Sequence, residues 1–217
     1  MFLSVFDMFK VGIGPSSSHT MGPMVAAARF LDMMRTSPFH FAGVRASLHG
    51  SLAFTGIGHA TDRATILGLA GFVPETYDHA KAETALAALQ KDQTLHPDGL
   101  EPLKFNPKSD LVFGYETPLP GHANGMILMA TDAQGDITLQ QAFYSIGGGF
   151  VMTEEELAAG NNTDEGSPVP YPFKSAAEML SMAQTSGKSI AQMKRANELS
   201  RDGHNRLKSG TAQLWQV

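Results

Sequence analysis

Between residues 24 and 48 the spacing of apolar side chains changes from a helical period to a strand period. The first part follows the i, i+3, i+4, i+7 spacing of an amphipathic helix, with Met24, Ala27, Ala28, Leu31 and Met34 on one face. From residue 44 onward, apolar and polar side chains alternate as in a half-buried strand. Both periods in one chain are compatible with a fold in which helices pack on a sheet.

Capping residues, glycines, prolines and apolar alternation predict the elements that follow. They are a helix from Thr61 or Asp62 to about Gly71, a helix over about 78–91, short strands or loops over 94–120, and a hairpin of residues 126–130 with residues 137–143. The mixture of helices and strands therefore continues to about residue 150.

A change of composition after residue 158 predicts a domain boundary. Residues 160–172 are rich in Asn, Asp, Gly and Pro, as linkers are. Two serines are each followed three residues later by Glu or Gln, and these capping boxes open two helices separated at Gly187; the pairs are Ser175 with Glu178 and Ser189 with Gln192. We predict a domain over 1–158, a linker over 159–172, and over 173–217 the start of a helical domain that is truncated here.

Composition excludes several classes of function. The chain has 217 residues, 42% of them hydrophobic, with a formal net charge of −5 and scattered basic residues, so nucleic acid is not an expected partner. No apolar run is long enough to span a membrane, and the N-terminus lacks the pattern of a secretion signal, so a cytoplasmic location is the default expectation. The absence of cysteine excludes disulfides, thiol nucleophiles and thiolate-held metal centres in this chain.

The stretch GIGPSSSHT at residues 12–20 is predicted to be a loop that runs into a helix N-terminus. Ser18 or Thr20 can cap the helix, and Pro23 is tolerated in its first turn. One capping hydroxyl meets the local need, yet the loop also carries Ser16 and Ser17. The surplus hydroxyls, the glycines and the positive end of the helix dipole suit an anion such as a substrate carboxylate.

Histidines in glycine-rich loops are further candidates for the site. His59 lies beside Thr61 and Asp62, which could orient a neutral imidazole as a proton acceptor. A ligand role for His122 and Asn124 is weaker, because a turn before a buried strand also explains them. The other histidines are assigned to surface or packing roles; they are His40, His49, His79, His96 and His204.

The triple glycine Gly147-Gly148-Gly149 has two interpretations that remain open: a bulge or bend between strands, or close approach of a ligand to the backbone. It does not match a phosphate-binding loop. The sequence contains no pattern typical of a metal site, so no metal is expected within this chain.

Five stretches in order closely resemble the bacterial iron-sulfur-dependent L-serine dehydratases, also called L-serine ammonia-lyases. They are SVFDMFKVGIGPSSSHTMGP, GSLAFTGIGHATD, LPGHANGM, YSIGGGF and VPYPFKSAAEML. The resemblance covers nearly the whole chain and fits the N-terminal, or beta, domain of the single-chain form. It implies an α+β fold with helices on a mixed sheet, similar to the allosteric substrate-binding domain of some phosphoglycerate dehydrogenases.

The resemblance also implies a reaction and a division of roles. L-serine is converted to pyruvate and ammonia, and a 4Fe-4S cluster, held by cysteines of a C-terminal catalytic domain absent from this chain, acts as a Lewis acid. His59 is expected to take the α-proton, with His19 as the second choice. The expected substrate-binding residues are Ser16, Ser17, Ser18, Thr20, His122, Asn124, Gly147 and Gly148. The expected partners are L-serine, the catalytic domain and a second copy of the protein in a homodimer.

Two other functions are weighed beside this one. The domain could instead be a regulatory module that binds an amino acid and acts on the catalytic domain. Dehydration by pyridoxal phosphate needs a Schiff-base lysine and a phosphate loop, and no lysine lies near residues 147–149. Pyridoxal phosphate is therefore not expected.

Overall fold

The computed structural model describes residues 2–159 and 168–216, except for the side chain of residue 202. The chain forms two compact units, one of residues 12–160 and one that joins residues 1–11 to residues 161–217. The first eleven residues thus belong with the C-terminal unit, a grouping that the predicted domain 1–158 did not include. Residues 160–167 of the predicted linker lie outside the described residues.

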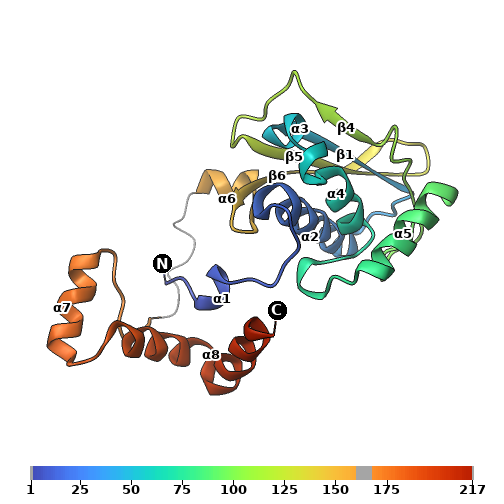
Figure 1. The fold of residues 1–217 in the computed structure, drawn as a ribbon. Coiled ribbons are helices and arrows are strands. Elements are labelled where there is room, and N and C mark those ends of the chain that lie inside the picture. Colours follow the sequence, from blue (N-terminus) through green and yellow to red (C-terminus); the bar gives the residue numbers. More distant parts are fainter. Residues whose placement is uncertain (1, 160–167, 217) are drawn as a thin grey trace. The chain divides into compact units, whose positions relative to one another are not determined.

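The larger unit is a layer of helices on a mixed sheet (Figure 1). Its helical elements are η1 (Ser17–Met21), α2 (Gly22–Thr36), α3 (Ser51–Phe54), η2 (Ile57–His59), α4 (Thr61–Leu69), η3 (Pro74–Thr76), α5 (His79–Asp92) and α6 (Glu154–Ala159). Its strands are β1 (Gly43–Gly50), β2 (Thr94–Leu95), β3 (Leu103–Lys104), β4 (Leu111–Gly114), β5 (Asn124–Thr131), β6 (Ile137–Gly147) and β7 (Phe150–Thr153). The predicted α+β class, with helices packed on a mixed sheet, is confirmed.

The strand order is β2-β3-β1-β5-β6-β7, and β4 also pairs with β1. β1 runs parallel to β3 and β4 and antiparallel to β5. The predicted hairpin is β5 with β6, and its turn contains Gly135 at φ 92°. Because β5 begins where β1 ends, the C-terminal end of β1 and the start of β5 share one end of the sheet.

The main core lies between one face of the sheet and helices α2, α4 and α5 (Figure 1). Alternate residues of β1 and β5 supply the strand side of this core, as their period predicts; they include Val44, Ala46, Leu48, Met126 and Leu128. Helices α2 and α4 approach closely at Gly68, where a Cβ would lie 2.5 Å from the Met24 carbonyl oxygen. This contact fixes the end of α4 against the start of α2.

The smaller unit contains α1 (Val5–Met8), α7 (Ala176–Ser186) and α8 (Ile190–Trp215). Ser189 and Gln192 form the predicted capping box of α8, and Ser175 caps α7. Glu178 bonds to the amide of Lys174 instead of that of Ser175. No helix in the described part of the chain has both the length and the apolar character needed to cross a membrane.

Candidate functional site

The stretch 12–20, which we call the serine loop, enters α2 through a π-helical turn, η1, that directly precedes this helix. Ser16 caps this turn, because its hydroxyl accepts a hydrogen bond of 3.1 Å from the amide of His19. The predicted caps Ser18 and Thr20 are therefore wrong, since the helical segment begins earlier than the apolar period that marks α2. The amides of Ser17 and Ser18 have no acceptor among the described residues, as expected at a helix N-terminus.

His19 lies inside this turn, and hydroxyl groups contact both nitrogens of its ring. Nδ1 lies 2.9 Å from the Ser18 hydroxyl, and Nε2 lies 2.8 Å from the hydroxyl of Ser51, at the start of α3. A hydroxyl can donate or accept, so the two serines hold the ring in place in either neutral tautomer. Burial lowers the pKa of His19, and the nearby His59 lowers it further. The imidazole is thus held neutral near pH 7.

His59 lies next to His19, with 4.9 Å between the ring centroids. Its Nδ1 is 3.0 Å from the carbonyl oxygen of Thr55, which can only accept, so Nδ1 carries the proton of the neutral ring. The lone pair is then on Nε2, for which the described residues offer no hydrogen-bond partner. A neutral imidazole in this tautomer can accept a proton at Nε2.

Two threonines join the segments that carry these histidines. The Thr20 hydroxyl donates to the His59 carbonyl oxygen at 2.8 Å, and the Thr61 hydroxyl donates to the His19 carbonyl oxygen at 2.6 Å. The prediction that Thr61 or Asp62 orients the His59 ring is wrong, because Thr61 reaches the other segment and the Thr55 carbonyl orients the ring. Nor does a side chain cap α4, whose N-cap is Ala60.

His122 and Asn124 lie at the end of the sheet where Ser51 lies. Asn124 pairs with Gly50 in the sheet, and the amide of the next residue, Ser51, donates to the Ala123 carbonyl at 2.8 Å. The side-chain amide of Asn124 donates to the carbonyl oxygen of Ser145 at 3.0 Å. The backbone amide of Asn124 donates to Nδ1 of His122 at 3.1 Å. The Asn124 side chain is thus partly occupied in joining β5 to β6.

The triple glycine forms the turn between β6 and β7. Gly147 pairs with Phe150 after a bulge, and Gly148 and Gly149 have φ values of 60° and 73°. Two consecutive positive φ values are typical of a tight hairpin turn, which explains why glycine is needed here. A role of Gly147 and Gly148 in substrate binding stays a prediction.

Sequence reasoning missed two residues that orient the histidines. The only sequence feature that marks Ser51 is its position directly after Gly50, at the end of the predicted strand. Its contact with His19 joins residues 32 positions apart, so local patterns do not predict it. Thr55 acts through its backbone, so its side-chain type carries little information. The position of Thr55 four residues before His59 was the one sequence feature that could have indicated this contact.

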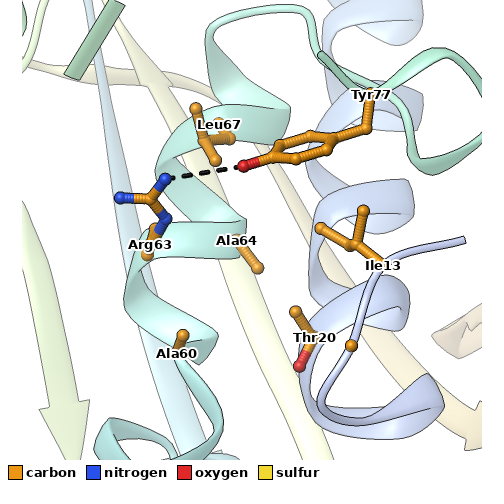
Figure 2. Close-up of a pocket in the computed structure, with 8 residues that line it drawn as sticks. Ile13, Thr20, Ala60, Arg63, Ala64, Leu67 and Tyr77 are labelled. Atoms are coloured by element: carbon orange, nitrogen blue, oxygen red, sulfur yellow. Dashed lines mark hydrogen bonds between the residues drawn. The ribbon is translucent and has the colours of Figure 1, made fainter. Parts of the chain in front are cut away.

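A pocket with a cavity volume of about 330 Å³ lies beside the histidines, between α4, the serine loop and Tyr77 (Figure 2). Two of its lining residues, Thr20 and Ala60, directly follow His19 and His59. The others are Ile13, Gly14, Arg63, Ala64, Leu67 and Tyr77. The pocket and the histidine pair are therefore built on the same two segments.

The chain offers no ligand set for an iron-sulfur cluster. It contains no cysteine, and the described residues contain no group of three or more His, Asp or Glu side chains placed to hold a metal ion.

The buried histidine His49 is bonded to the Thr117 carbonyl and to Ser47, in keeping with a packing role.

A family model described as the serine dehydratase beta chain matches residues 4–156. An L-serine dehydratase of Streptomyces coelicolor is 38% identical to this chain over 219 residues, covering 100% of the chain and 48% of that protein. An L-serine dehydratase of Helicobacter pylori is also 38% identical, over 93% of the chain and 44% of that protein. The Escherichia coli L-serine dehydratase TdcG is 38% identical over 99% of the chain and 47% of that protein. The chain thus spans about half the length of the curated relatives it matches.

Proposed function

The chain belongs to the serine dehydratase beta-chain family, and from this premise we propose that it forms part of an L-serine dehydratase. The reaction converts L-serine to pyruvate and ammonia by loss of water and hydrolysis of the resulting enamine or imine. The chain supplies the groups that bind the substrate carboxylate and the base that removes the α-proton. The names of the relatives support the substrate, and the serine loop with its two histidines supports the roles.

The N-terminal turn of η1 binds the carboxylate of the substrate. The amides of Ser17 and Ser18, which have no acceptor among the described residues, and the exposed Ser17 hydroxyl can donate to an anion. The helix dipole favours negative charge there. Thr20 does not take part through its hydroxyl, which is buried and already bonded to the His59 carbonyl. Its contribution is to hold the two segments together.

His59 is the general base, and His19 is a positioning residue. The observation that carries this assignment is the bond from Nδ1 of His59 to the Thr55 carbonyl, which leaves a lone pair on Nε2. Both nitrogens of His19 contact serine hydroxyls, so His19, Ser18 and Ser51 hold one another in place beside His59. His122 and Asn124 help to orient the substrate from the end of the sheet.

The residues of this chain do not fit a 4Fe-4S cluster, because thiolates hold such clusters and the chain has none. If the enzyme uses the cluster that the resemblance implies, cysteines from a catalytic region outside this chain hold it. That region and a second copy of the chain are the proposed macromolecular partners.

The test compares two proteins under anaerobic conditions for pyruvate formation from L-serine. One is this chain alone, and the other joins the chain to a cysteine-bearing catalytic region. We expect activity only in the second protein, with exchange of the L-serine α-proton for solvent deuterium dependent on His59. Pyruvate formation by this chain alone, or proton exchange that survives His59→Ala, would contradict the proposal.

A further inference from the structure

The pocket beside the histidines has no part in the proposed reaction. Its volume of about 330 Å³ is at the lower end of the range for small-molecule sites, roughly 300–1,000 Å³, so it suits a ligand of a few heavy atoms. In Figure 2 the α4 residues form one wall, Ile13 and Thr20 form the other, and the Tyr77 hydroxyl points toward Arg63.

The walls combine an apolar surface with one cation. Ile13, Ala60, Ala64 and Leu67 supply apolar groups, and the polar groups are the hydroxyls of Thr20 and Tyr77 with the guanidinium of Arg63. Among the eight described residues that line the pocket, Arg63 is the one that carries a charge at neutral pH, and none is acidic. This composition favours an organic anion with a short apolar part.

Arg63 keeps donors for a ligand although it is already paired. One terminal nitrogen donates to the Tyr77 hydroxyl at 3.5 Å and to a carboxylate oxygen of Glu83. The other terminal nitrogen and Nε have no acceptor among the described residues. The hydrogen bond to Glu83 raises the pKa of Arg63, so the guanidinium stays charged. Glu83 is half exposed and competes with any anion for this guanidinium.

Backbone strain marks the same pocket. Ala60 has a φ of 52°, a left-handed conformation that costs energy for a residue with a Cβ. Such strain persists where the surrounding structure holds it, and it is frequent at ligand-binding sites. Here it places Ala60 in the wall, between His59 and the start of α4.

We propose that this pocket binds a small aliphatic monocarboxylate without an ammonium group, with its carboxylate on Arg63 and its carbon chain against Ala64 and Leu67. An amino acid fits less well, because the described residues that line the pocket include no acidic side chain to pair with a buried ammonium group. The site is separate from the carboxylate site at Ser17 and Ser18. It does not depend on the proposed reaction, because the binding can be measured in this chain without turnover.

Calorimetric titration of the 217-residue chain tests the ligand chemistry. Propionate and pyruvate are expected to bind, whereas propionamide, which lacks the charge, and L-alanine, which adds an ammonium group, bind at least about tenfold more weakly. Equal affinity for propionate and propionamide, or no heat with either acid at millimolar concentrations, would overturn the proposal.

Three variants locate the site. Arg63→Gln is expected to weaken propionate binding at least about tenfold, because the glutamine keeps a donor but loses the charge. Glu83→Gln is expected to tighten it by up to about fivefold, since it frees the guanidinium from a competing exposed ion pair. Arg45→Gln, the same change at an exposed arginine outside the pocket, is the control and leaves propionate binding unchanged. If Arg63→Gln fails to fold, Glu83→Gln decides: unchanged or weaker binding in that variant contradicts the site, as does weaker binding in Arg45→Gln.

Discussion

At the scale of single residues, two adjacent histidines differ because of what their ring nitrogens contact. The His19 ring is held between two hydroxyls, whereas a carbonyl fixes one nitrogen of His59 and leaves the other nitrogen available. The same side-chain type is therefore suited to positioning at residue 19 and to proton transfer at residue 59.

Replacing His59 by alanine removes the proposed base. In a protein that joins this chain to the catalytic region, kcat for pyruvate formation is expected to fall by about 10²–10⁴-fold, with a much smaller change in KM. His40→Ala, at an exposed position, is the matched control and should keep the wild-type rate. A His59→Ala enzyme that retains most of its kcat would rule out this assignment.

The titration of His19 is expected to respond to His59. In the wild type the pKa of His19 lies below 6.5 because of burial and, secondly, because of His59. In His59→Ala the pKa should rise, since the repulsion between the rings is removed, as measured by NMR titration of the imidazole signals. A His19 pKa that does not move would contradict an electrostatic effect of His59 across the 4.9 Å between the ring centroids.

The lowered pKa of His19 also predicts the direction of pH-dependent stability. Between the folded pKa and about 6.5 the unfolded chain binds more protons, so the free energy of unfolding falls as the pH drops through that window. Urea unfolding at pH 7.5 and at about pH 5.5 measures this change. His19→Gln should reduce the difference between the two pH values, and an unchanged difference would exclude His19 as its source.

At the scale of elements, the serine loop is fixed because α2 packs closely on β6. A Cβ at Gly22 would lie 2.0 Å from Oγ and 2.7 Å from Cβ of Ser145, so only glycine fits at the junction of η1 and α2. Ser145 is buried, and its hydroxyl has no hydrogen-bond partner in the described part of the chain. This close packing sets the distance between the serine loop and the end of the sheet.

Gly22→Ala is expected to lower the free energy of unfolding by about 1–3 kcal/mol, because the added methyl overlaps Ser145. Ser145→Gly should recover part of this loss in the double variant, as a double-mutant cycle in urea would measure. Gly58→Ala is the control, since nothing lies within 4 Å of a Cβ there. Additive losses in the cycle would show that the two residues do not interact.

At the scale of the whole molecule, the two ends of the chain meet in the smaller unit. The buried Glu198 of α8 accepts hydrogen bonds of 2.7 Å from both the hydroxyl of Ser4 and the amide of Val5. Lys194 adds a bond to the Leu3 carbonyl and lies 4.2 Å from the centroid of the Phe2 ring. The N-terminal segment is therefore held by α8, about 190 residues away in sequence.

Glu198→Gln should loosen this N-terminal segment. The amide retains one acceptor oxygen and places a donor against a donor, at a cost of about 1–3 kcal/mol for a buried site. Hydrogen exchange at the Val5 amide is expected to accelerate, while exchange in β1 and β5 stays unchanged. Glu101→Gln, at an exposed position, is the control, and equal exchange at Val5 in both variants would contradict the role of Glu198.

Local patterns predicted much of the fold because they reflect local physics. The alternation in β1, the helix over about 78–91 and the capping box of α8 depend on residues a few positions apart, and each prediction is confirmed. The start of the helical segment at Ser17 was missed, because a π-helical turn leaves no apolar period. His59 was preferred to His19 as the base, but the ring contacts that distinguish the two histidines join residues whose contacts the local patterns do not predict.

Composition and short-range spacing were enough to predict the main helices and strands, the absence of cysteine ligands and the residue types of the serine loop. They could not predict which nitrogen of His59 is available, that Ser51 contacts His19, or that Arg63 and Tyr77 line one pocket with Ala60. These features depend on contacts between residues far apart in sequence. Such contacts form only when α2 and α4 pack together on the sheet. They depend on burial and backbone geometry, which local spacing does not predict.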